Sequence, residues 1–176
     1  MQLPRTALSA FALSLGLYAC TPKPASSAAK PPIAQAPQTE AELADRTIAK
    51  VQRIIQQTDE RLNRIEPIRD TLPLEAGQQA PRTLALWMDE GKAVKLQVGE
   101  PGPGDGSSST FYFAGPDLFY AAQPYAHFVF IGGKLQYWCD ESWQVNQVDA
   151  ATLDQREGFL YEEANQYLGW FFGTGE

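Results

Sequence analysis

A ten-residue pattern that occurs twice in the C-terminal half limits the possible folds of this chain more than any other feature. Residues 111–120 and 128–137 share F-x-F-x-G-x-x-L-x-Y, with five identities in ten positions. Each copy predicts a β-hairpin with a two-residue loop, Gly115-Pro116 or Gly132-Gly133, because glycine readily takes the positive φ that such loops require. Repeated hairpins of this kind predict an antiparallel meander.

The hairpin loops also set which side chains share a face of the sheet. In the second copy, a two-residue loop pairs Phe130 with Leu135 and, further along, Phe128 with Tyr137. One face then collects the repeated apolar residues Phe111, Phe113, Leu118, Tyr120, Phe128, Phe130, Leu135 and Tyr137. The opposite face carries Tyr112, Phe119, His127, Val129, Gln136 and Trp138.

This second face has two interpretations. Large aromatic side chains beside an amide and an imidazole are typical of a contact surface, so an open face predicts a binding site for a protein or a glycan. Alternatively, helices cover both faces of the sheet and these residues belong to the core. The chain holds 20 Phe, Tyr and Trp residues, and 17 of them lie from Phe111 onward, so most must be buried in either case.

Residues 39–66 predict a long amphipathic helix that Pro67 ends. Thr39 and Glu42 form a capping-box pattern at its start. Apolar residues then recur at spacings of three and four, which places them in one stripe. The stripe consists of Ala44, Ile48, Val51, Ile55, Thr58, Leu62 and Ile65. A coiled coil would show the same stripe, but Thr58 in the seam and a run of only three heptads favour packing on the protein's own sheet.

The rest of the chain supplies another hairpin and a second helix. Residues 83–88 and 93–98 predict a pair of strands, and residues 99–109 predict a glycine-rich loop. A C-terminal helix is expected over residues 151–172, where Gly173 ends it. The predicted fold is therefore α+β: a single antiparallel β-meander of about six strands, with a long N-terminal amphipathic helix and a C-terminal helix packed on it.

The N-terminus carries the pattern of a bacterial lipoprotein signal. An apolar run over residues 7–19 follows Arg5 and is shorter than the ~20 residues that a membrane-spanning helix needs. Leu17-Tyr18-Ala19-Cys20 has a small residue directly before the cysteine and a leucine three positions before it. An ordinary secretory signal with an incidental cysteine is the alternative.

Three segments follow from this interpretation. We expect residues 1–19 to be a signal peptide, residues 20–38 to be a palmitate-bearing Cys20 with a Pro/Ala-rich tether, and residues 39–176 to be a single domain. Thr21, not aspartate, follows the cysteine. In a Gram-negative cell that choice is similar to the pattern of lipoproteins sent to the outer membrane, on its periplasmic or surface side.

The lipidation motif, tether, helix, φ-x-φ-x-G-x-x-L hairpins and terminal helix together resemble the uncharacterised small bacterial lipoproteins that share this repeated strand signature. The resemblance covers most of residues 39–172. It implies the same architecture, while contact with the membrane through the N-terminal lipid is expected from the lipidation motif at Cys20. No activity is attached to that group, so the resemblance assigns no site.

Charge excludes one class of partner. Residues 1–38 hold three of the 14 basic residues and none of the 21 acidic ones, which leaves 11 basic against 21 acidic residues, a net charge of −10, from Thr39 onward. Nucleic-acid binding needs a basic surface, so no nucleic-acid partner is expected.

The sequence predicts no catalytic site, metal site or cofactor. His127 is the only histidine, and the predicted register places it on the opposite face of the sheet from Cys139, so the two cannot form a nucleophile–base pair. The carboxylate pairs Asp140-Glu141 and Glu162-Glu163 fit a turn and a solvated helix face better than the spaced carboxyls of a glycosidase.

The function expected from these observations is that of a lipid-anchored, non-catalytic binding or scaffold module of the cell envelope. Its partner there would be a protein or a glycan. The alternative is an inhibitor or accessory protein of an envelope hydrolase, whose cleft an acidic, aromatic-tipped loop would fill.

Overall fold

The computed structural model describes residues 39–74, 80–99 and 108–173. The predicted signal peptide, the lipidation site Cys20 and the tether lie outside the described residues, as does most of the predicted 99–109 loop. The described residues belong to one compact unit that begins at Pro37.

Within the described residues, two helices flank a seven-stranded antiparallel meander in which every strand pairs with its neighbour in sequence. The elements are α1 (Glu40–Leu62), β1 (Ile68–Thr71), β2 (Thr83–Asp89), β3 (Lys92–Gly99), β4 (Ser108–Ala114), β5 (Asp117–Gln123), β6 (Ala126–Ile131), β7 (Lys134–Asp140) and α2 (Ala150–Phe172). The α+β meander is confirmed, with seven strands in place of about six. The additional strand is β1, whose four residues are all exposed and therefore show no hydrophobic pattern.

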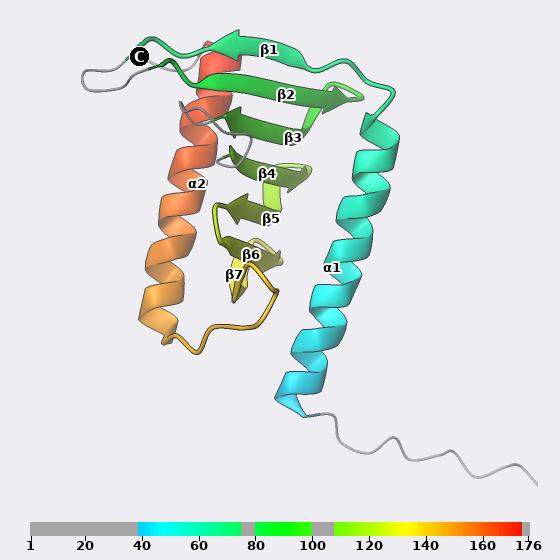
Figure 1. The fold of residues 1–176 in the computed structure, drawn as a ribbon, viewed down its shortest axis with the longest axis vertical. Helices are drawn as coiled ribbons and strands as arrows, with labels where there is room; N and C mark the ends of the chain where they lie inside the picture. The colour runs from blue at the N-terminus through cyan, green and yellow to red at the C-terminus, as the bar shows by residue number, and fades with distance from the viewer. Residues whose placement is uncertain (1–38, 75–79, 100–107, 174–176) are drawn as a thin grey trace, which may run out of the picture. The chain divides into compact units, whose positions relative to one another are not determined.

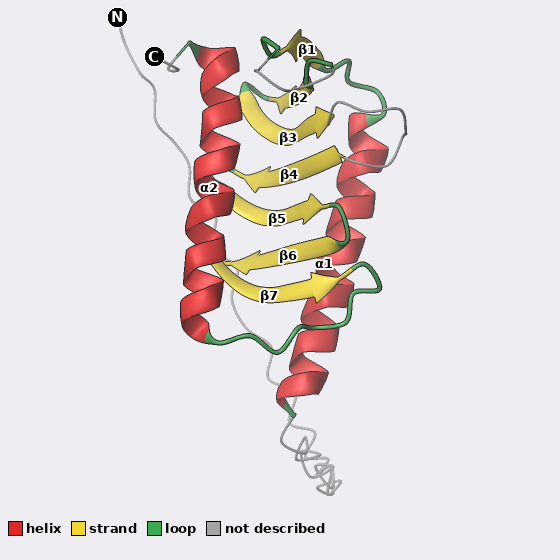
Figure 2. Cartoon of the chain, turned by 60° about the vertical axis from the view of Figure 1, so that its left-hand side comes forward, coloured by secondary structure: helices red, strands yellow, loops and turns green. Residues whose placement is uncertain are grey.

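The two helices lie on opposite faces of the sheet, and both run across the strands (Figures 1 and 2). Each helix has 23 residues. At ~1.5 Å per residue such a helix is ~34 Å long, which suits a sheet of this width at ~4.8 Å per strand spacing. Both helices begin near β7 and end near β1, so their N-termini lie at the same end of the domain.

The capping box predicted for α1 is present. The Thr39 hydroxyl accepts a hydrogen bond from the Glu42 amide (3.2 Å), and the Glu42 carboxylate accepts one from the Thr39 amide (3.1 Å). The predicted stripe is only partly buried. Ala44, Ile48, Val51, Thr58 and Leu62 are buried. Ile55 and Ile65 are half-buried, and Leu43, outside the stripe, is 52% exposed. The amphipathic pattern of this helix is therefore less clear than the sequence suggests.

The larger core lies between the sheet and α2. It joins phenylalanine and leucine side chains of β2 to β7 with three residues of α2: Leu160, Ala164 and Tyr167. Polar contacts follow the same helix across the sheet. Glu157 accepts a hydrogen bond from the Leu135 amide of β7, and near the other end the Trp170 indole donates to Asp70 of β1.

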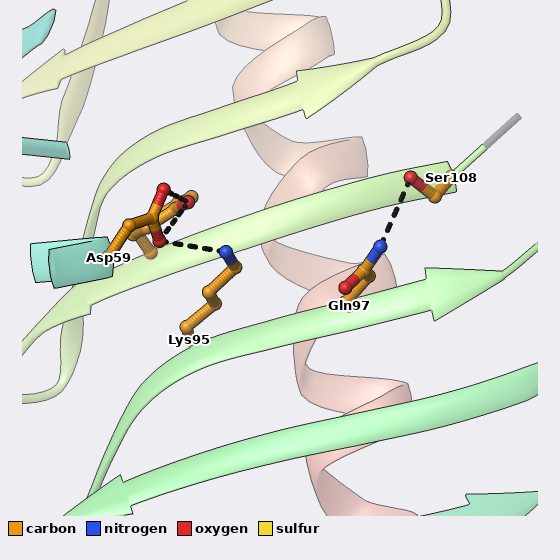
Figure 3. A network of polar contacts seen from close by, with 5 residues as sticks. Asp59, Lys95, Gln97 and Ser108 are labelled. Carbon is orange, nitrogen blue, oxygen red and sulfur yellow. Dashed lines mark hydrogen bonds and ion pairs between the residues drawn. The ribbon is translucent and has the colours of Figure 1, made fainter. Parts of the chain in front are cut away.

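A smaller cluster lies between the opposite face and α1. It consists of Val51 from the helix and of Tyr112, Tyr120 and Val129 from the sheet. Asp59 of α1 reinforces this contact, because its carboxylate accepts hydrogen bonds from the Tyr112 hydroxyl (2.9 and 3.0 Å) and from Lys95 Nζ (2.8 Å; Figure 3). The helix therefore packs on its own sheet, as the sequence favoured over a coiled coil.

The described hairpins β2–β3, β4–β5 and β6–β7 share one geometry that the sequence analysis did not predict. Each has a two-residue loop followed by a β-bulge on the second strand, at Val94, Phe119 and Gln136 respectively. Gly132 and Gly133 have φ values of 59° and 77°, as a type I′ turn requires. In the two repeat hairpins, β4–β5 and β6–β7, the first two pairs after the loop therefore match the predicted register, and the later ones do not.

The bulge moves every later residue of the second strand to the other face. Phe130 pairs with Leu135 as predicted, but Phe128 pairs with Trp138 and not with Tyr137. In the first copy, Tyr120 likewise lies on the α1 face rather than with Phe111. The predicted alternation was a poor guide because helices cover both faces, so both faces accept apolar residues and neither register looks wrong.

The outer edge of β7 is partly closed by the chain that follows it. The Asn146 amide donates to the Trp138 carbonyl, and the Asp140 amide donates to the Gln144 carbonyl. At the start of the strand, the Glu157 carboxylate accepts a hydrogen bond from the Leu135 amide. Such contacts block the pairing of another strand along this edge.

Candidate functional site

The predicted binding face is not an open surface. Tyr112 and Val129 lie beneath α1, where they are 4% and 0% exposed. Trp138 lies on the α2 face, against Phe128 and Arg156, because the bulge at Gln136 reverses its direction. The interpretation that helices cover both faces is therefore correct, and the six predicted residues do not form one patch.

His127 belongs instead to an aromatic stack beside β7. Its ring lies 4.0 Å from the Trp143 ring at an interplanar angle of 9°, and Trp143 also stacks on Tyr120 (5.5 Å, 13°). Trp143 has a φ of 64°, a left-handed conformation that is unusual for a tryptophan. The stack therefore fixes the chain between β7 and α2 against the sheet.

The hydrogen bonds of His127 are those of a neutral imidazole. Nδ1 lies 2.7 Å from the Tyr120 hydroxyl. Burial raises the pKa of Tyr120, so the hydroxyl stays protonated and donates to Nδ1. Burial also lowers the pKa of His127, while its hydrogen bond with the backbone of Glu141 acts in the opposite direction. The imidazole is therefore engaged by the Tyr120 hydroxyl through Nδ1.

The predicted register, which separated Cys139 from His127, is wrong at these two residues. The bulge makes the two residues direct cross-strand partners on one face. The thiol is nevertheless completely buried, and this desolvation raises the pKa of Cys139 to about 11. A nucleophilic cysteine needs a lowered pKa and an accessible thiolate, so the pair lacks both requirements.

The carboxylate pairs have structural roles. Asp140 Oδ1 accepts hydrogen bonds from the amides of Ser142 (2.8 Å) and Gln144 (2.9 Å), which fixes the turn after β7. On α2, Glu163 accepts a hydrogen bond from Gln123 of β5 (2.9 Å), and Glu162 is exposed. The Asp140 contacts agree with the predicted turn, and Glu162 lies on the solvated helix surface as predicted, whereas Glu163 is half-buried against β5.

A groove of about 800 Å³ lies at the β7 end of the domain. The first turns of α1 extend past β7 (Figure 1), and residues of these turns line one wall of the groove. The groove is lined by Thr39, Glu40, Ala41, Ala44 and Asp45 of α1, residues 136–138 of β7, residues 143–148 of the following loop, and Leu153 of α2. We call it the β7 groove.

The walls of the β7 groove combine rings and amides. Tyr137, Trp138 and Trp143 are half-buried and supply the rings. The amide side chains come from Gln136, Gln144, Asn146 and Gln147, all of which are exposed. Within the described part of the chain, none of these amide side chains is hydrogen-bonded to another residue. They are therefore available to an external partner.

Two of the six predicted site residues, Gln136 and Trp138, line the β7 groove. The amides of residues 144–147 were not among the predicted site residues. A signal for them existed, because Gln-Val-Asn-Gln follows Trp143 in the short connection between the last strand and the last helix, where binding residues are often found.

The described residues contain neither a cluster of acidic, histidine and cysteine side chains that could hold a metal ion nor a helix long and apolar enough to cross a membrane. Comparisons with protein-family models, with curated proteins and with solved structures return no match to this chain.

Proposed function

We propose that this chain is a lipid-anchored, non-catalytic binding module of the bacterial cell envelope, and that the β7 groove is its binding site. The observation that carries the proposal is the set of unpaired amide side chains beside Trp138 and Trp143 in a groove of about 800 Å³. This volume lies within the ~300–1,000 Å³ range of ligand sites, which combine rings with a few polar groups.

The location of the groove also supports this function. Thr39 caps α1 and lines the groove, so the segment that bears Cys20 joins the domain at the binding end. A lipid on Cys20 would keep this end of the domain near an envelope surface. The tether of residues 21–38 would span at most ~55 Å as an extended polyproline-type chain.

The chemistry of the titratable groups supports a role in binding rather than in catalysis. His127 is hydrogen-bonded to Tyr120 through Nδ1 and stacked on Trp143, and Cys139 is buried with a raised pKa. Asp140 is engaged in the turn after β7. None of these groups is arranged as an accessible nucleophile with a base beside it.

In-cell photocrosslinking tests the binding function. A photoreactive phenylalanine analogue at Gln147, in the groove, should capture an envelope component. The same analogue at Gln52, an exposed glutamine on α1 outside the groove, is the matched control. Equal capture from both positions, or none from Gln147, would refute the groove as the binding site.

A Cys20→Ser variant tests the anchor separately. It should remain uncleaved or leave the membrane fraction, and the Gln147 crosslink should be lost with it. A Cys20→Ser protein that is cleaved and still sediments with membranes would contradict lipid anchoring.

One observation favours the second candidate function, an inhibitor or accessory protein of an envelope hydrolase. Tyr125, at the tip of the β5–β6 turn, is 80% exposed and has a φ of 66°. A projecting aromatic ring on a tight turn is suited to insertion into a cleft, although the Pro124-Tyr125 loop holds no acidic residue. If Tyr125→Ala abolishes capture of a hydrolase while groove variants do not, this second function replaces the first.

A further inference from the structure

The charge of the β7 groove restricts its ligand. The charged side chains among its described lining residues are Glu40 and Asp45, and both are acidic. Lysine, arginine and histidine are missing from that described lining. A phosphate-rich or uronic acid-rich ligand would therefore meet only repulsion, whereas a neutral ligand, or one with amino groups, would not.

The edge of β7 argues against an extended peptide as the ligand. Peptides that bind as an added strand pair with the free backbone groups of a sheet edge. Along β7, the Trp138 carbonyl and the Asp140 amide are already paired with the loop, and the Leu135 amide is bound by Glu157. What remains for a ligand in the groove is side-chain chemistry.

The rings of the groove offer flat surfaces beside these side chains. One face of Trp143 lies on His127 and Tyr120, and the same residue lines the groove. Since this stack determines the position of the indole, little rotational freedom is lost when a ligand packs against it. Tyr137 and Trp138 also line the groove, Tyr137 from the α1 side of β7 and Trp138 from the α2 side, where its ring packs on Phe128 and Arg156.

We propose that the β7 groove binds a neutral, hydroxyl-rich oligosaccharide. This proposal rests on the proposed binding function. A sugar ring has an apolar C–H face that packs on an aromatic ring, and a rim of hydroxyl groups that both donate and accept hydrogen bonds. Amide side chains also both donate and accept, so Gln136, Asn146 and Gln147 can satisfy such a rim, while a purely apolar ligand would leave them unpaired.

Titration calorimetry of the full-length, detergent-solubilised protein tests the proposal. The probes are tetrasaccharides of N-acetylglucosamine, β-1,4-glucose and α-1,4-glucose, followed by an array of other neutral glycans. We expect saturable binding by at least one of them. Gln136→Ala and Gln147→Ala should each weaken that binding about five-fold, as the loss of one typical net hydrogen bond predicts, while Gln52→Ala should leave it unchanged.

Several results would overturn the proposal. Failure of every neutral glycan to bind, or binding that both groove variants leave unchanged, would do so. A polyanionic glycan or a peptide that displaces the neutral one at lower concentration would also do so. If the Gln147 photocrosslink still captures a protein while no glycan binds, the binding function stands and the oligosaccharide assignment falls.

Discussion

The carboxylate of Asp59 attaches α1 to the sheet, and its removal tests how firmly this helix is held. In Asp59→Ala, the Tyr112 hydroxyl loses its acceptor although Tyr112 is only 4% exposed. The ammonium group of Lys95 loses its counter-ion as well, and its remaining neighbours are the rings of Trp87 and Tyr112 at 5.2 and 5.0 Å.

We expect Asp59→Ala to lower the free energy of unfolding by about 2 kcal/mol. A buried donor left without an acceptor costs about 1–3 kcal/mol. The ion pair with Lys95 adds little, because the Asp59 side chain is 40% exposed and water screens the interaction. The higher helix propensity of alanine offsets about 0.5 kcal/mol. For a domain of this size the melting temperature should fall by roughly 5–8 °C.

Urea unfolding followed by circular dichroism measures this change. Tyr112→Phe and the double variant complete a double-mutant cycle, in which we expect a coupling free energy of about 1.5 kcal/mol. Gln57→Ala, an exposed position two residues earlier on α1, is the control and should change stability by less than about 0.5 kcal/mol. If Asp59→Ala falls within the same limit, or the cycle is additive, the proposed attachment is refuted.

Three further predictions concern the aromatic residues on the α1 face. Burial raises the pKa values of Tyr112 and Tyr120, so these phenols ionise at a lower pH in the unfolded chain than in the folded one. The free energy of unfolding should therefore fall as the pH rises above ~10. Ultraviolet absorbance should show both phenols ionising only with unfolding. Burial lowers the pKa of His127, so as the pH falls the imidazole is protonated at a higher pH in the unfolded chain than in the folded one. The free energy of unfolding should therefore decrease as the pH falls below ~6.5 and stay level just above it, and His127→Gln should remove this dependence in denaturant titrations. Because Trp143 has a positive φ, Trp143→Ala should be about 1 kcal/mol less stable than Trp143→Gly by urea midpoint, and the opposite order would show that the left-handed backbone carries no strain.

The elements that sequence could predict are those that depend on neighbouring residues. The capping box of α1 involves only four consecutive residues, and each hairpin loop has only two. Thr39 and Gly132-Gly133 therefore specify their local geometry without reference to the rest of the fold. The strand β1 was missed for the converse reason. Its residues Ile68–Thr71 pair with β2 although they are all exposed, so tertiary pairing alone defines this strand.

Side-chain direction beyond the hairpin loops was not predictable from the residues alone. The bulge at Gln136 depends on pairing across the sheet. Because of this bulge, Trp138 points toward α2, and Cys139 lies beside its cross-strand partner His127 on the other face. Alternation can reveal such a shift only where one face is polar. Since α1 and α2 cover the two faces, that evidence is missing from this sequence.

Only part of the candidate site could be predicted from the sequence, for a related reason. Gln136 and Trp138 were selected as members of a flat face, yet they meet at an edge groove whose second wall comes from residues almost a hundred positions earlier in the chain. The contact between the start of α1 and the loop after β7 is long-range. Hydrophobic periodicity carries no information about such a contact.

The chemistry of the two sheet faces explains why the groove lies where it does. The α2 face is filled mainly by phenylalanine and leucine, which need no hydrogen-bond partners. The α1 face carries Tyr112 and Tyr120, whose hydroxyls are satisfied by Asp59 and His127, and its buried cluster is smaller. A small, partly polar interface contributes less stability than a large apolar one.

Elements attached in this way are those that proteins commonly use for binding, because they can adjust without disturbing the main core. The β7 groove is built mostly from such elements, since one wall is the start of α1 and the other is the loop held by Trp143. Under the proposed binding function, the start of α1 would adjust to a ligand, while the loop fixed by the Trp143 stack and the core beneath α2 would keep their positions.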